Sequence, residues 1–75
     1  QDESSFEAAS FAVVIAELQR QYPVQIQTPT IINKQFTGSF PHNNLEVALR
    51  SVCEPLGLSF DIDGEHVTIY AAAKQ

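Results

Sequence analysis

Residues 39–62 read SFPHNNLEVALRSVCEPLGLSFDI, and this stretch decides the fold because it carries one helical pattern between two strand-like segments. Asn43 is expected to cap the helix, with Glu46 three residues later in the spacing of a capping box. Pro55 is expected to end or distort the last turn, and Gly57 suits a left-handed exit. The apolar residues that recur on one helical face are Leu45, Ala48, Leu49, Val52 and Leu56.

The same pattern occurs a second time, 34 positions earlier in the chain. Residues 5–28 read SFEAASFAVVIAELQRQYPVQIQT, and Ser5 and Phe6 align with Ser39 and Phe40. A period of about 34 is also that of tetratricopeptide arrays, but those repeats are helical throughout and need about three copies to bury a continuous face. Each half here has a single helical pattern flanked by strand-like residues, so the sequence predicts two tandem β-α-β units.

The first half has its own helix signals. Ser10 is a natural N-cap, and Pro23 prevents the helix from continuing past Tyr22. Residues 24–27 alternate apolar and polar side chains as a half-buried strand does, and residues 5–8 are expected to form a short strand before the helix. The apolar stripe of this helix consists of Phe11, Val14, Ile15, Leu18 and Tyr22.

The end of the chain predicts a β-hairpin. Asp63 and Gly64 form a favoured dipeptide for a two-residue type I′ turn, which would join a strand over 58–62 to a strand over 65–70. A further strand is expected over 35–40, before the second helix. The expected cross-strand pairs in the hairpin are Phe60 with Val67, Leu58 with Ile69, Asp61 with His66 and Ser59 with Thr68.

These patterns predict an α+β fold: a tandem β-α-β repeat with two helices packed on small sheets and a carboxy-terminal β-hairpin. The chain has 75 residues, a length typical of one domain, and such a domain buries only about 60% of the surface that its unfolded chain exposes. We therefore expect a single domain over residues 1–75, with repeat halves at about 5–28 and 39–62 and the hairpin at 58–70.

Charge and composition exclude several classes of partner. Nine acidic and four basic side chains give a formal net charge of -5, which repels phosphate backbones and anionic membrane surfaces. With 44% hydrophobic residues the chain is rich enough in core-forming side chains to fold. It contains no apolar run near the roughly 18 residues of a membrane span, and no basic-then-apolar leader. We expect neither nucleic-acid binding nor direct membrane contact by this fragment.

The sequence offers no arrangement that points to catalysis. His42 and His66 lie in a loop and on a strand, without the spacing of metal ligands. Ser51 and Ser59 have no positioned base, and Cys53 has no assignable histidine partner. Cys53 occupies an apolar helical position, where a buried structural thiol is favoured over a reactive one. We therefore expect no enzyme activity, no metal and no cofactor.

A small sheet has edges, and an edge strand is either shielded or used by a partner chain through strand addition. The terminal strand over His66–Tyr70 is the preferred edge, with Thr68 and Tyr70 pointing outward to a partner. An edge that is merely tolerated is the alternative. In the connector between the halves, one of Ile31 and Ile32 is expected to tuck under the core, and contact with a partner is the less favoured role for them.

The order of these elements resembles the carboxy-terminal domain of FecR-type anti-sigma regulators. That domain is similar in turn to the secretin and TonB amino-terminal (STN) domain, which has the same duplicated β-α-β plan. The helix over 11–22 and the strand over 24–26 fit the pattern, so the resemblance covers nearly the whole chain. Its most specific stretches are residues 36–40 (FTGSF), 45–49 (LEVAL), 56–58 (LGL) and 67–69 (VTI).

The resemblance implies the periplasmic signalling domain of a single-pass inner-membrane protein. Its cytoplasmic part, absent from these residues, would modulate an extracytoplasmic-function (ECF) sigma factor, and this domain would receive the signal from a TonB-dependent outer-membrane transducer. The alternative is an STN-type domain of a TonB-dependent receptor or secretin that organises an assembly. A membrane helix upstream of Gln1 would support the first hypothesis, and a barrel-length continuation after Gln75 the second.

Overall fold

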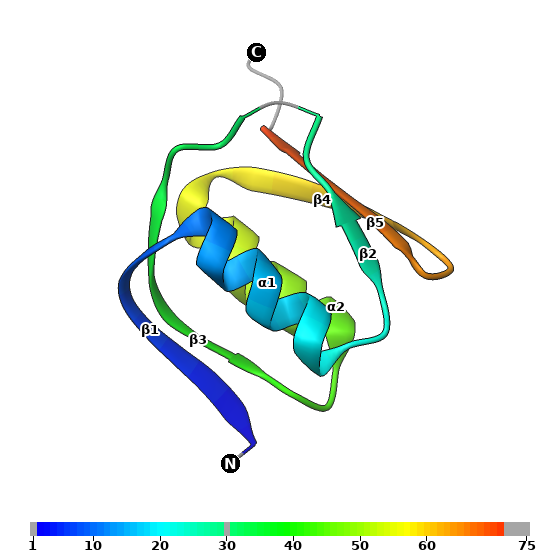
Figure 1. Ribbon diagram of the computed structural model, residues 1–75, viewed down its shortest axis with the longest axis horizontal. Helices are drawn as coiled ribbons and strands as arrows, with labels where there is room; N and C mark the ends of the chain where they lie inside the picture. The colour runs from blue at the N-terminus through cyan, green and yellow to red at the C-terminus, as the bar shows by residue number, and fades with distance from the viewer. Residues whose placement is uncertain (1, 30, 72–75) are drawn as a thin grey trace.

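The computed structural model describes residues 2–29 and 31–71 of the chain. Within these residues two α-helices lie between two small β-sheets (Figure 1), which confirms the expected α+β fold and the β-α-β order. In chain order the elements are β1 (Glu3–Ser10), α1 (Phe11–Gln21), β2 (Gln25–Gln27), β3 (Gln35–Pro41), α2 (Leu45–Cys53), the short 3-10 helix η1 (Glu54–Leu56), β4 (Leu58–Asp63) and β5 (His66–Ala71).

The first sheet pairs the two strands that precede the helices, and the second gathers the strands that follow them. β1 and β3 are antiparallel to one another. The second sheet has the order β2-β5-β4, with β5 parallel to β2 and antiparallel to β4. A parallel pair needs a long crossover connection. The residues between β2 and β5, which include β3, α2 and β4, provide it.

Both helices begin at capped residues. The Ser10 hydroxyl accepts from the Val13 amide at 3.4 Å, as expected. The second cap is Asn44, whose side chain accepts from the Val47 amide at 3.2 Å, so the expectation of Asn43 is wrong. Asn43 and Asn44 have the same side chain, so the sequence alone does not show which one caps the helix. A tertiary contact favours Asn44, because its backbone N–H donates to the Tyr22 hydroxyl.

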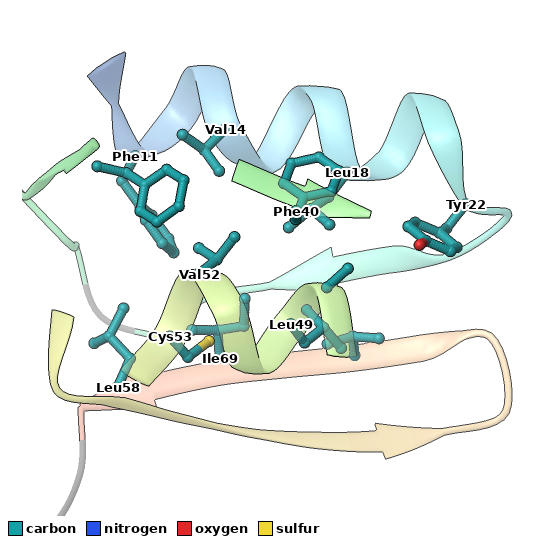
Figure 2. Packing of buried hydrophobic residues seen from close by; sticks show 13 residues of the cluster. Phe11, Val14, Leu18, Tyr22, Phe40, Leu49, Val52, Cys53, Leu58 and Ile69 are labelled. Atoms are coloured by element: carbon teal, nitrogen blue, oxygen red, sulfur yellow. The ribbon is translucent and has the colours of Figure 1, made fainter. Parts of the chain in front are cut away.

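The two helices bury their stripes against each other between the sheets. In Figure 2 Val14 and Leu18 of α1 point toward α2, where Val52 rises to meet them. Ile15 is the one member of the first stripe that stays half-buried. Thirteen residues form the core: Phe11, Val14, Leu18, Tyr22, Phe36, Phe40, Ala48, Leu49, Val52, Cys53, Leu58, Val67 and Ile69.

A local two-fold axis relates the two halves. Ser5 and Ser39, which align in the sequence, face each other across β1 and β3. On either side of them Ser4 pairs with Phe40, and Phe6 pairs with Gly38. In the sequence repeat Ser4 aligns with Gly38, and Phe6 aligns with Phe40. Exchanging the two halves therefore converts the first pair into the second, as a two-fold axis between Ser5 and Ser39 would do. The sequence repeat is therefore matched by a two-fold arrangement at the centre of this strand pair.

The hairpin register differs from the expected one by two positions. The loop residues are Gly64 and Glu65, and Asp63 pairs with His66. Gly64 has φ 62°, whereas Glu65 is not among the described residues with positive φ. This pattern fits a type II′ turn, in which only the first loop residue needs positive φ. A shift of two keeps every side chain on its expected face, and the observed pairs include Phe60 with Ile69, Ile62 with Val67, Asp61 with Thr68 and Ser59 with Tyr70.

β1 contains a bulge that places a non-glycine residue in the left-handed region. The pairing shifts between Phe6 and Ala9, so that two residues of β1 lie opposite one of β3. Ala8 has φ 50° at this point, and its amide donates to the Thr37 hydroxyl at 2.9 Å. A left-handed conformation costs an L-residue about 1–2 kcal/mol through crowding of its Cβ, so Ala8 is a strained position.

We expect Ala8→Gly to raise the free energy of unfolding by up to about 1 kcal/mol, because relief of the strain exceeds the added entropy of the unfolded chain. Urea denaturation followed by circular dichroism measures this change. Ala9→Gly is the matched control: Ala9 packs against the core in ordinary strand geometry, and its loss should lower stability. A destabilised Ala8→Gly variant would contradict the account of the bulge.

The Tyr22 hydroxyl ties the end of α1 to the start of α2. It donates to the Pro41 carbonyl and accepts from the Asn44 amide at 3.0 Å. The side chain is 9% exposed, so water replaces these bonds poorly once they are lost. The last residue of the first stripe therefore also fixes the cap of the second helix.

We expect Tyr22→Phe to lower the free energy of unfolding by about 1–3 kcal/mol, since it leaves a carbonyl and an amide without their partner. Urea denaturation at neutral pH is the measurement. Tyr70→Phe is the control, because the Tyr70 hydroxyl makes no hydrogen bond to any residue in the ranges 2–29 and 31–71; its effect should stay within about 0.5 kcal/mol. Equal losses in both variants would rule out the proposed tie.

Candidate protein-binding site

Three polar side chains from separate elements meet beside β1. The Ser4 hydroxyl donates to Glu17 Oε2 at 3.1 Å and lies 2.7 Å from His42 Nε2. A serine nucleophile needs an imidazole that accepts its proton and a carboxylate that holds the other ring nitrogen. Here the Ser4 hydroxyl donates its hydrogen bond to the carboxylate, and the His42 ring nitrogen is its second neighbour. The three residues tie β1 to α1 and to the loop after β3, without the order of a catalytic triad.

Glu17 is held in its charged form by its neighbours. The Gln21 side-chain amide donates to its carboxylate and is the main cause of the lowered pKa of Glu17. Burial acts in the opposite direction, and hydrogen bonds from Ser4 and Arg20 lower the pKa further. The sequence contains no signal for this cluster, because Ser4 and His42 are 38 positions apart. Only the pairing of β1 with β3 brings them together.

The single cysteine is a buried structural residue, as expected. Cys53 is 1% exposed and lies in the core, and burial raises the pKa of its thiol to about 11. The thiolate is the reactive form, so this side chain is a weak nucleophile at neutral pH.

The described ranges hold neither a cluster of metal-ligating side chains nor a helix that could span a membrane. Groups of three or more His, Cys, Asp or Glu side chains that could hold a metal ion do not occur there. His42 contacts Ser4, while His66 lies on the opposite sheet. None of the helices in the same ranges has the length and apolar character needed to cross a membrane.

β5 is the central strand of its sheet, so the prediction that it forms an edge is wrong. β2 pairs along one side of β5, from Gln25 opposite His66 to Gln27 opposite Thr68. β4 pairs along the other side. Periodicity predicted each strand but could not show that β2 crosses back to lie against β5. The backbone of His66–Thr68 is therefore paired on both sides and closed to strand addition, while Ile69–Ala71 pair with β4 alone.

The side chains of β5 that were predicted to bind a partner lie on the outer face of this sheet. Val67 and Ile69 are buried against the helices, and His66, Thr68 and Tyr70 alternate with them. His66 is exposed, while the other two are half-buried. At His66 and Thr68 a partner can reach only the side chains, because β2 and β4 both pair with this part of the backbone.

The free edges of the sheet belong to β2 and β4. In β2 the Gln25 amide donates to the Glu65 carbonyl beside β5. Because alternate residues of a strand direct their amides to opposite sides, the Ile26 amide faces outward, and it donates to Gln19 Oε1 of α1 at 2.8 Å. One exposed glutamine side chain therefore covers the outward amide of this edge.

The two connector isoleucines have different surroundings. Ile32 packs against the core, as expected for one of the pair. Ile31 is 90% exposed and borders a hollow of about 350 Å³ between α1 and β2. The connector runs from β2 past the amino-terminal end of α1 to β3 (Figure 1). The structure thus brings Ile31 together with the edge of β2, and leaves the β5 residues on a separate face.

Comparison with solved structures shows a shared fold. Two crystal structures of a candidate anti-sigma factor from Parabacteroides distasonis ATCC 8503, at 2.50 and 1.65 Å resolution, each match with a TM-score of 0.82 at 19% sequence identity. Each match covers 95% of this chain and 34% of the other, so the chain spans about a third of the length of those proteins.

Comparison with protein families places the chain more closely. No curated protein matches it. Residues 3–69 match the family described as FecR, C-terminal. That range runs from the first residue of β1 to the buried Ile69 of β5 and so takes in both β-α-β units and the hairpin. The chain therefore belongs to the FecR C-terminal domain family.

Proposed function

We propose that this domain is the periplasmic signalling domain of a transmembrane anti-sigma regulator. In this role it binds the signalling domain of a TonB-dependent outer-membrane transducer, and the rest of its protein transmits the event to an ECF sigma factor. The observation that carries the proposal is the family match over both β-α-β units. The likeness in fold to a candidate anti-sigma factor supports it.

The chemistry of the described residues favours binding over catalysis. The Ser4 proton is directed to Glu17 instead of to an imidazole base. The Cys53 thiol is buried and protonated. Among these residues the large aliphatic side chain with the greatest exposed fraction is Ile31, which lies beside a free sheet edge. Such an arrangement offers surface and backbone to another protein.

Two surfaces are proposed to contact the transducer. The first is the outer face of β5, where His66, Thr68 and Tyr70 present side chains in a row. The second is the connector at Ile31 and Ile32. The alternative function, a receptor or secretin domain that organises an assembly, would use the same fold, and the order of segments in the parent protein separates the two.

Isothermal titration calorimetry tests this function. This domain is titrated against the signalling domain of each TonB-dependent transducer of the source organism. We expect one of these domains to bind. Failure of every transducer domain to bind would overturn the proposal.

We expect Thr68→Lys and Tyr70→Lys each to weaken that binding by about tenfold or more, equivalent to about 1.4 kcal/mol, because a charge would be desolvated at the contact. Val47→Lys, at an exposed position of α2, is the matched control and should bind normally. Thermal melts by circular dichroism confirm that the variants fold. Unchanged affinity in both β5 variants would remove this face from the interface.

A further inference from the structure

The two halves treat their equivalent sheet edges differently. Ala12 and Ala16 stand on α1 beside the edge of β2 and line its hollow. The residues aligned with them in the second half, 34 positions later, are Glu46 and Arg50 of α2, which form an ion pair at 2.8 Å. The same helix face is therefore charged in one half and reduced to methyl groups in the other.

The hollow beside β2 is apolar and open. Its volume is about 350 Å³, and half-buried Ile15 and Ile26 line it together with Ile31. Ile31 is 90% exposed, and burial of such a side chain contributes about 1.5–3 kcal/mol. Most of the binding free energy that a partner would gain by covering this hollow therefore comes from burying Ile31 at its rim.

A basic group stands at one end of the hollow. A second depression of about 310 Å³ shares Phe11, Ala12 and Ile32 with the first and extends it to Lys34. Among the residues that the structure describes, Lys34 is the only Lys or Arg that forms no salt bridge. The first turn of α1 holds no acidic residue, so the positive end of the helix dipole adds to the charge of Lys34.

The geometry points to this groove, between α1, the edge of β2 and the connector to Lys34, as a docking site for an extended strand of a partner protein. The strand adds to the outer edge of β2, inserts an aliphatic side chain beside Ile31, and directs a carboxylate to Lys34. Gln19 releases the Ile26 amide, which then donates to the backbone of the incoming strand. The inference rests on the proposed function in that the partner is a protein.

The size of the groove sets the spacing of these groups. From Gln19 to Phe11 the helix rises about 12 Å at 1.5 Å per residue, which an extended strand covers in about four residues. Side chains on one face of a strand recur every second residue. The aliphatic anchor and the carboxylate therefore stand two or four positions apart. A second copy of this chain fits poorly, because each copy carries a charge of -5 and brings the same Lys34 to the contact.

The double variant Ala12→Glu/Ala16→Arg tests the groove in the intact domain. It copies the ion pair of α2 onto exposed positions of α1 in a favourable helical spacing, so we expect normal folding and a stability change within about 0.5 kcal/mol. Binding of the transducer domain should fall at least tenfold. The matched control, Glu46→Ala/Arg50→Ala, removes the ion pair from the equivalent helix face of the second half and should bind normally. If wild type and Ala12→Glu/Ala16→Arg bind equally, the docking site is wrong while the proposed function stands.

A peptide experiment tests the groove without any transducer. The probes are the peptide Thr-Val-Thr-Ile-Thr-Glu-Thr and the same peptide with Lys in place of Glu, titrated to millimolar concentration against the ¹⁵N-labelled domain. We expect the acidic peptide to shift the amide signals of residues 25–27 and 31–34, and the basic peptide to act at least about tenfold more weakly. The overall charge of -5 would by itself favour the basic peptide. Tighter binding of the acidic peptide would therefore indicate a contact with Lys34.

Two results would overturn the inference. One is the absence of shifts in those segments, or shifts confined to β4. The other is an equal or stronger response to the basic peptide, or persistence of the response in Lys34→Glu, since either removes the carboxylate contact. Peptide binding in the groove together with no binding by any transducer domain supports the docking site and rejects the proposed function, so the two failures are distinguishable.

Discussion

The antiparallel pairing of β1 with β3 is the constraint on which the rest of the structure depends. It places Ser5 opposite Ser39 and so fixes the two-fold relation between the halves. It brings the Phe6 ring to centroid distances of 6.0 Å from Phe36 and 5.8 Å from Phe40, which closes one side of the core. The ladder continues beyond the strands, where the His42 amide donates to the Asp2 carbonyl and positions the ring beside Ser4.

The two-fold relation is broken by β5, which has no counterpart in the first half. It lies between β2 and β4, which are the equivalent strands of the two halves, and pairs with the inward edge of each. Their outward edges stay free, and the side chains of the neighbouring helices then distinguish them. On α2 an ion pair stands at the positions that two alanines occupy on α1. The hollow beside β2 is lined by isoleucines, whereas the hollow between α2 and β4 is lined in part by the charged Arg50 and Glu54. The same backbone plan thus carries an apolar helix face beside one outward edge and a charged helix face beside the other.

The surface chemistry fits a domain whose role is to bind. Its polar cluster serves to connect elements, since Glu17 accepts from Ser4, Arg20 and Gln21 together. The Cys53 thiol contributes packing. Within residues 2–29 and 31–71, the groove at β2 combines exposed apolar surface, an outward backbone amide and a lysine without a salt bridge. Each of these features would be stabilised by contact with another chain, which agrees with membership of the FecR C-terminal family.

The sequence by itself determined the elements, because they follow from local patterns. The helical stripes, the cap at Ser10 and the left-handed exit at Gly57 are read from residues within one turn of each other. The sequence also predicted correctly which face of the sheet each hairpin residue occupies, because the alternation of side chains is unchanged by a register shift of two. Tertiary structure decided the cap at Asn44, the central place of β5, and the meeting of Ser4 with His42. Each of these rests on contacts between residues far apart in the chain, which the chemistry of neighbours along the sequence does not encode.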